Sequence, residues 1–350
     1  MDVVKEVLSD QNFIGAILGS IVFIFLGFIL RRKGILKDGA KEVLNVLVLD
    51  IAIPCMAFCA FTSDFKEEEF VTNVLLFVYD LVFYVLFVLL GNLVFLKKEA
   101  TARKIYALLL AVGQLTLFSM PILKEVYGSE SGVLIPTSLM SVDFRLVVYI
   151  YGYIVISGQK ITKKTFLPAM KRIFLTPVMI LMLLGFLIWI TQSVFPKVNV
   201  NGTDYSPLRI DKTLPALYAV FRYGDAMATP LSMFLIGVTL GSSDVLTALK
   251  NKTAWIIALG RMLFVPGLFL ALTVGLKALG VFPLNEIQLA ALVIGNAAPV
   301  GAVLAVFCVN YNKESYVASD SVLLSTLLSV VTLPLYFVLV KFVCTLPLFA

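Results

Sequence analysis

The chain has 350 residues, of which 60% are hydrophobic and only 14% are charged. Soluble domains carry about 25% charged residues, so the composition excludes a soluble fold and indicates a polytopic membrane protein. There is no histidine, which excludes histidine zinc sites, serine–histidine dyads and histidine proton relays. The net charge of +6 does not indicate nucleic-acid binding, because the basic residues lie in short loops between apolar segments.

Ten apolar segments are long enough to cross a bilayer, which takes about 20 helical residues. We therefore predict an all-α polytopic membrane protein with ten transmembrane helices. In chain order the segments are 12–31, 41–62, 70–96, 103–124, 132–158, 173–195, 214–241, 253–280, 286–310 and 316–347. The second, fourth, seventh and ninth contain proline, glycine, amide or charged residues near their middles.

The distribution of lysine and arginine predicts the orientation, since short cytoplasmic loops carry an excess of both. The loops after the odd-numbered segments are the basic ones, and the loop after the fifth segment is the start of a polar connection, 159–172. We expect a cell-membrane protein with both termini outside the cytoplasm. The net acidic start, Met1 to Gln11, does not resemble a secretory signal, so we expect the first helix to be retained.

Two segments share the order glycine, carboxamide, proline. It reads Gly113-Gln114 to Pro121 in the fourth segment and Gly295-Asn296 to Pro299 in the ninth. Proline disrupts a helix, and non-helical backbone within a membrane persists only where protein or a watery cavity surrounds it. Interrupted helices at matching positions of two halves indicate a transporter's binding site, although prolines that merely kink ordinary helices remain an alternative.

The chemistry of such a site suits a carboxylate. The starts of half-helices carry partial positive charge, and side-chain amides offer both donors and acceptors. The predicted substrate-binding residues are Gln114, Ser119, Pro121, Gly295, Asn296 and Pro299.

The chain also repeats weakly. Pro54 and Pro230 are 176 positions apart, and Pro121 and Pro299 are 178 apart. Two nearly equal offsets indicate a duplication of five helices, and because five is odd the second repeat must have inverted topology. The predicted units are 1–158 for the first repeat, 159–212 for a cytoplasmic loop, the sixth helix and an outer loop, and 213–350 for the last four helices.

Ionisable residues inside membrane spans are costly and are functional candidates by default. Asp50, Asp80 and Asp320 are candidates for ion or proton coupling, and Arg261 is a candidate for attracting an anion. Pairing with neighbours, or snorkelling of Arg261 to the interface, is the alternative. Coupling by Na⁺ or H⁺ is left open, and no other cofactor is expected.

Three further features concern packing. Arg222 and Asp225 are three positions apart on one helix, which predicts a structural ion pair. Asp143 and Arg145 are two apart and do not face each other, so each is expected to find a partner on another helix. The serines at 321, 325 and 329 share one helix face, which suits either close packing or a polar path.

Five stretches carry a likeness to a known family, namely residues 47–54, 120–123, 261–266, 296–299 and 318–335. In these stretches the sequence resembles the auxin efflux carrier family, which includes plant auxin carriers and bacterial malate and malonate permeases. There is no long central insert, so it resembles the short bacterial-type members. The resemblance implies a fold similar to bile acid/sodium symporters, with a scaffold of helices 1, 2, 6 and 7 and a transport domain of helices 3–5 and 8–10.

The resemblance further implies a substrate site where helices 4 and 9 cross, with Pro121, Pro299 and Asn296 at the crossing, and elevator-like transport of organic anions. Gln114 stands where the family commonly has asparagine. We predict a permease of small carboxylates, not an enzyme, that works in the lipid bilayer without nucleic acid; assembly as a homodimer is left open. The alternatives are an intramembrane aspartyl protease that uses Asp80 and Asp225, and an anion channel.

Overall fold

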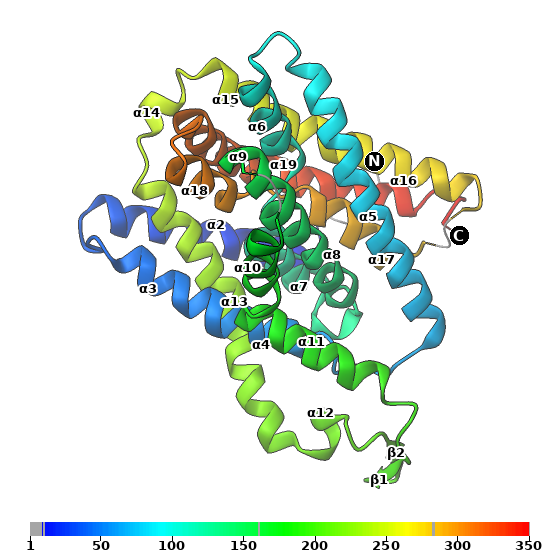
Figure 1. Cartoon of the computed structure of the whole chain (residues 1–350). Helices are drawn as coiled ribbons and strands as arrows, with labels where there is room; N and C mark the ends of the chain where they lie inside the picture. The colour runs from blue at the N-terminus through cyan, green and yellow to red at the C-terminus, as the bar shows by residue number, and fades with distance from the viewer. Residues whose placement is uncertain (1–8, 10, 160–161, 282–283, 350) are drawn as a thin grey trace.

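The computed structural model describes residues 9, 11–159, 162–281 and 284–349. Most of the acidic N-terminal segment and positions 160 and 161 of the basic loop lie outside these ranges. The described chain is a bundle of helices (Figure 1), and seven of them are long and apolar enough to cross a membrane. This confirms a helical, polytopic membrane protein. The other three predicted spans are helical but short or interrupted, so the number ten stays a prediction.

Five predicted spans are continuous helices. They are α2 (Gln11–Arg32), α5 (Glu67–Val94), α11 (Pro177–Ile190), α13 (Pro215–Gly241) and α19 (Ser315–Cys344). On α5 the side chains of Val71, Val78, Val82 and Leu89 are exposed, at the spacing of one helix face. The opposite face, which includes Asp80, is buried against the bundle. An apolar outer face suits lipid, and the same periodicity directs Asp80 inward.

Three predicted spans continue through a wider, π-helical turn. They are α3, η1 and α4 (Ala40–Val46, Leu47–Ala52, Ile53–Cys59), α8, η4 and α9 (Leu134–Leu146, Val147–Gly152, Tyr153–Ser157), and α15, η5 and α16 (Lys252–Leu259, Gly260–Phe264, Val265–Ala278). Pro54 and Pro266 follow η1 and η5, in the first turn of the next α-helix. Because proline clashes with the turn before it, the wider turn accommodates the ring without ending the helix.

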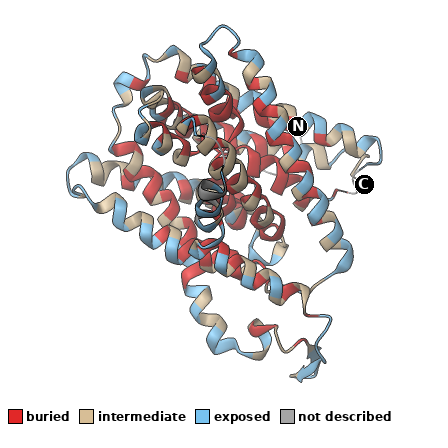
Figure 2. Ribbon diagram, viewed as in Figure 1, coloured by how far each residue is buried: buried red, intermediate tan, exposed pale blue. Residues whose placement is uncertain are grey.

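Two predicted spans are truly broken. The fourth consists of α6 (Ala100–Ala111), η2 (Leu115–Ser119) and α7 (Met120–Tyr127), and the ninth of α17 (Glu286–Asn296) and α18 (Ala302–Asn310). Both breaks lie in the interior, where Figure 2 shows the densest burial.

The helices pack as two groups. In the first, α13 packs against α2, α3 and α4, and α11 packs against α4. In the second, α5 packs against α6 and α8, while α17 packs against α8, α16 and α19. Figure 1 shows α3, α4, α11 and α13 on one side of the molecule and α5, α6, α15 and α16 on the other. The half-helix α7 joins the groups, because it packs against α2 and α13 as well as α8 and α17.

Two predicted loops contain further structure. The basic connection includes helix α10 (Lys163–Phe174). The polar loop after α11 contains a short hairpin of β1 (Val198–Val200) and β2 (Thr203–Tyr205), which the sequence analysis did not predict. Asn201 and Gly202 at the hairpin turn both have positive φ, the conformation that an Asn-Gly dipeptide adopts in two-residue hairpins. Three short helices complete the described chain: η3 (Ser129–Ser131), α12 (Ile210–Thr213) and α14 (Val245–Ala248).

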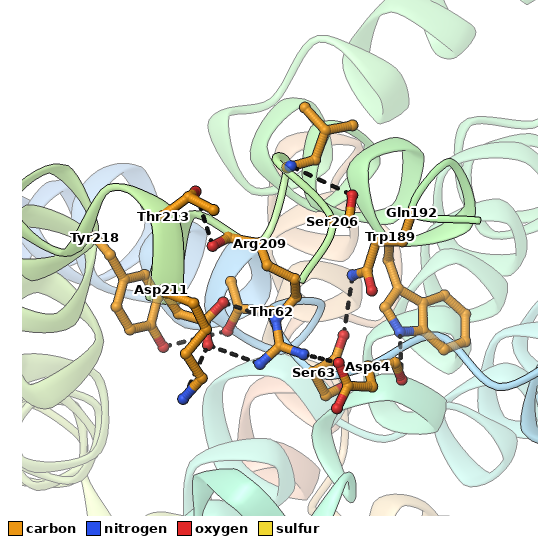
Figure 3. A network of polar contacts seen from close by, with 12 residues as sticks. Thr62, Ser63, Asp64, Trp189, Gln192, Ser206, Arg209, Asp211, Thr213 and Tyr218 are labelled. Atoms are coloured by element: carbon orange, nitrogen blue, oxygen red, sulfur yellow. Dashed lines mark hydrogen bonds and ion pairs between the residues drawn. The ribbon is translucent and has the colours of Figure 1, made fainter. Parts of the chain in front are cut away.

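A polar network fixes the loop after α11 to the first group of helices (Figure 3). The guanidinium of Arg209 donates two hydrogen bonds of 2.8 Å to Asp211 and also pairs with Asp64. The bond to Asp211, followed by the two carboxylate charges, raises the pKa of Arg209. The Gln192 side chain donates to the Ser63 carbonyl over 3.0 Å. These bonds tie the loop after α11 to the connection between α4 and α5.

Candidate functional site

The two broken helices meet at their breaks. Gly113 and Val300 form an isolated antiparallel bridge, and the backbone N–H of Gln114 donates to the Pro299 carbonyl over 2.7 Å. Backbone groups in a membrane interior must be satisfied by protein. Each break therefore supplies hydrogen-bond partners for the other, which makes this crossing a defined structural site.

A second set of bonds completes the crossing. The Gly301 amide donates to the Val112 carbonyl over 3.0 Å. The Val300 amide donates to the Ser325 hydroxyl of α19 over 3.0 Å. One member of the predicted serine face thus reaches the break in α17–α18 and satisfies a backbone donor there.

Arg261 binds the carbonyl ends of both breaks. Its side chain is buried, and its Nε donates to the Ala298 carbonyl over 2.9 Å. Its Nη1 and Nη2 donate to the carbonyls of Ala111 and Asn296, each over 2.7 Å. Ala111 and Asn296 are the last residues of α6 and α17, where carbonyls lack intrahelical partners and carry partial negative charge. The guanidinium therefore neutralises both helix ends, and its charge is directed at backbone.

The close approach of Arg261 explains the glycine in the first break. A Cβ at position 113 would lie 1.9 Å from Nη2 of Arg261 and 2.9 Å from the Ala298 carbonyl oxygen. Residue 113 must therefore be glycine for the guanidinium to reach the carbonyl groups.

Asp80 of α5 joins the crossing through Asn296. The Asn296 Nδ2 donates to Asp80 Oδ1 over 2.6 Å. Asp80 is fully buried, and its Oδ2 has no hydrogen-bond partner in the described part of the chain. Asp80 also interacts electrostatically with Arg261. The structure thus brings three sequence candidates together: Asn296, Asp80 and Arg261.

Asp143 of α8 is a site residue whose neighbour the sequence did not predict. It is fully buried, and neither carboxylate oxygen accepts a hydrogen bond from any described residue. Its charged neighbour is Asp80, whereas Arg145 donates to the Ser141 carbonyl of its own helix over 2.9 Å. The expectation of partners on other helices was therefore wrong for Arg145. For Asp143 the facing helix supplies a like-charged group.

The other predicted substrate residues lie near the crossing but in unequal positions. Gln114 lies in the break with a partly exposed side chain, and Ser119 has a buried hydroxyl with no hydrogen-bond partner among the described residues. Pro121 lies in the first turn of α7, after the break, whereas Pro299 lies in the break itself. Gly295 is still helical. The glycine-amide-proline patterns of the two segments therefore do not match position by position. The fourth segment breaks at its glycine, Gly113, whereas the ninth breaks after its amide, Asn296.

Two coupling candidates lie elsewhere. Asp50 is exposed on η1, which packs against α3, α4, α11 and α13. Asp320 accepts a 2.7 Å hydrogen bond from Asn251, the residue that caps the start of α15. Asp320 thus joins α19 to α15, and neither aspartate has a described contact with the crossing.

Asp225 pairs with Lys124, not with Arg222 as the sequence predicted. Lys124 Nζ of α7 lies 2.6 Å from Asp225 Oδ1 and donates to the Asp225 carbonyl over 2.7 Å. Both residues are buried, whereas Arg222 is exposed. A buried carboxylate takes the cation that is buried with it. Because Asp225 and Asp80 have different partners, the structure does not support a protease dyad.

No curated protein matches the chain. Residues 12–337 match the family described as membrane transport protein, a range that contains both breaks, Asp80, Asp143 and Arg261. This family comprises membrane transporters and is not an enzyme family. The chain is therefore an integral membrane transporter and belongs to the membrane transport protein family, the auxin efflux carrier family that its motifs resemble.

Proposed function

We propose that the protein is a secondary transporter of small organic anions, in particular carboxylates, in the cell membrane, with its substrate site at the crossing of α6–η2–α7 and α17–α18. The observation that carries this proposal is the backbone bridge between Gly113 and Val300. Discontinuous helices that meet in this way present half-helix ends to a solute near mid-membrane.

The charges at the crossing favour an anion. Arg261 neutralises the partial negative charge at the carbonyl ends of α6 and α17. The partial positive charge at the starts of the half-helices that follow is then free to attract an anion. Thr116 and Ser119 on η2 have buried hydroxyls without hydrogen-bond partners in the described chain, and the side chain of Gln114 beside them is partly exposed. A carboxylate accepts hydrogen bonds from such donors.

The packing favours a carrier over a channel. One group of helices contains the crossing and contacts the other chiefly through α7. We propose that the group with the crossing moves against α2, α4, α11 and α13, as in an elevator. The sequence has no phosphate-binding loop for ATP, so the driving force is an ion or substrate gradient.

A ligand screen tests the substrate class. The purified protein is heated with malate, malonate and indole-3-acetate, each compared with its uncharged amide. A ligand that binds the folded state raises the unfolding midpoint, so we expect a carboxylate to raise it and the matching amide not to. If only uncharged compounds raise the midpoint, the anion proposal is wrong.

Uptake into reconstituted vesicles tests the site. Removing a hydrogen bond to a charged group costs about 1.5–3 kcal/mol, so we expect Gln114→Ala to reduce carboxylate uptake at least about tenfold. Asn92→Ala is the control, because the Asn92 side chain donates to the Val88 carbonyl of its own helix, α5, and not to the crossing. Unchanged uptake in both Gln114→Ala and Asn296→Ala contradicts the site.

The same uptake assay separates a carrier from a channel. Saturable uptake with counterflow supports a carrier, whereas flux that stays linear with concentration supports a channel.

A further inference from the structure

The charges buried beside the crossing do not balance. Asp80 and Asp143 are fully buried, and three of their four carboxylate oxygens have no hydrogen-bond partner among the described residues. The charged and titratable groups that act on them are each other, Arg261 from η5, and Tyr84 from the same helix as Asp80. Arg145, buried on the same helix as Asp143, donates to the Ser141 carbonyl and not to either carboxylate. Arg261 is therefore the one positive charge among the described residues that acts on the two carboxylates, so one further positive charge is needed.

Sodium does not suit the available ligands. In transporters with discontinuous helices, coupling sodium ions are held by the carbonyls of unwound backbone and half-helix ends. Here those carbonyls, at Ala111, Asn296 and Ala298, accept hydrogen bonds from Arg261. The guanidinium therefore occupies the place of a coupling cation. Among the described residues there is also no group of three or more acidic or cysteine side chains arranged to hold a metal ion.

We propose that Asp80 and Asp143 together hold one exchangeable proton beside the helix crossing, and that this proton is the coupling ion of transport. Asp80, which accepts the Asn296 hydrogen bond and lies near Arg261, is the ionised member. Asp143, whose charged neighbour is Asp80, carries the proton on a carboxylate oxygen. Two interacting carboxylates in a buried site cannot both ionise without a large electrostatic cost.

The proton site is one hydrogen bond away from the proposed substrate site. Asn296 is the last residue of α17, its carbonyl binds Arg261, and its side chain binds Asp80. A substrate that shifts the break after α17 changes the hydrogen bond from Asn296 to Asp80. Because this bond favours ionised Asp80, the affinity of Asp80 and Asp143 for their proton changes with it. This coupling step depends on the proposed transport function, but proton binding itself does not.

Thermal unfolding of the purified full-length protein tests the proton site without any substrate. Midpoints are measured over a pH series in sodium chloride and in choline chloride. We expect the wild-type midpoint to fall as pH rises, because the folded state keeps a proton that the unfolded state releases, and to be equal in the two salts. Asp143→Asn replaces the protonated carboxyl by a neutral amide, so we expect it to lose most of this pH dependence.

The matched control is Asp38→Asn, since the Asp38 side chain is 98% exposed; it should keep the wild-type dependence. The proposal is overturned if wild type shows no pH dependence, if Asp143→Asn retains it, or if sodium raises the wild-type midpoint but not that of Asp143→Asn. Should Asp143→Asn fail to fold, Asp80→Asn must shift the fall in midpoint to lower pH, because removing the like-charged neighbour weakens proton binding at Asp143; an unshifted pH dependence would overturn the shared site.

A second readout separates this inference from the transport proposal. In sodium-free vesicles, an imposed pH gradient should accelerate uptake of whichever of malate, malonate or indole-3-acetate raises the midpoint in the screen, in wild type but not in Asp143→Asn. Uptake that ignores the gradient overturns proton coupling. If all three acids fail to bind or enter while the pH dependence of unfolding behaves as expected, only the proposed function is contradicted.

Discussion

Gly113 and Arg261 share a small volume at the helix crossing. The glycine leaves space for the guanidinium, and the guanidinium supplies donors to three carbonyls that the breaks leave without helical partners. Arginine suits this task because its planar fork presents several N–H groups at fixed angles. Each residue type therefore follows from the backbone geometry of the two breaks.

Gly113→Ala should destabilise the protein. Its methyl group would overlap the Arg261 guanidinium, and forced overpacking costs about 1–3 kcal/mol. A lower unfolding midpoint than wild type checks this expectation. Gly15→Ala in α2 is the control, because a Cβ there meets nothing within 4 Å; equal effects of the two substitutions would contradict the account.

Arg261→Lys should also destabilise the protein despite keeping the charge. An ammonium cannot reproduce the fork to three carbonyls, and each buried polar group left without a partner costs about 1–3 kcal/mol. The same substitution at exposed Arg222 controls for loss of the guanidinium itself. An unfolding midpoint for Arg261→Lys as high as that of Arg222→Lys would show that the carbonyl bonds contribute little.

Among the elements, α7 has a special place because it belongs to a broken helix and also contacts both α2 and α13. Polar contacts at two places, Lys124 and Pro121, join it to α13. The first place has the Lys124–Asp225 ion pair, and the second has the hydrogen bond that the Thr229 hydroxyl donates to the Pro121 carbonyl over 3.2 Å. The crossing is thus mechanically connected to the other helix group through a half-helix of only eight residues.

The Lys124–Asp225 pair should show strong coupling in a double-mutant cycle. Removing one partner leaves a buried charge unpaired and costs about 3–5 kcal/mol, whereas replacing both by apolar residues is often nearly neutral. We therefore expect Lys124→Met and Asp225→Leu each to lower the unfolding free energy, and the double variant to recover most of the loss. Additive losses would show that the two charges do not interact.

At the scale of the whole molecule, two helix groups meet along a limited interface. Alternating access by an elevator requires these groups to slide, whereas a channel opens a continuous pore. The ion pair and the Thr229 contact lie across that interface, while the Asn251–Asp320 hydrogen bond lies within one group. The two kinds of contact allow motion between groups to be tested separately from motion within a group.

Cross-linking between the groups should stop transport. In a background without native cysteines, Lys124→Cys with Asp225→Cys joins α7 to α13, and Asn251→Cys with Asp320→Cys joins α15 to α19. We expect a short bismaleimide to abolish vesicle uptake of a carboxylate in the first variant and to spare it in the second. Full uptake in the first variant after complete cross-linking would exclude sliding at this interface.

The sequence determined the class of the protein and the location of its breaks. Membrane-length apolar segments and scarce charge suffice for a helical membrane protein, because backbone in hydrocarbon must bond to itself. Gly113 and Pro299 were correctly marked as interruptions, since glycine and proline are the residues that irregular backbone requires. The Asn201-Gly202 dipeptide is also typical of a hairpin turn, although the sequence analysis predicts only a polar loop there.

Only the tertiary structure decided which residues meet. Local spacing paired Arg222 with Asp225, but packing placed Lys124 there. It also packed α8, which contains Asp143, against α5, which contains Asp80, and brought Arg261 onto carbonyls of both breaks. The physical reason is that burial, which no local pattern specifies, removes water as a partner. A buried charge then takes whatever group the facing helix supplies, and the folded bundle alone determines which helix that is.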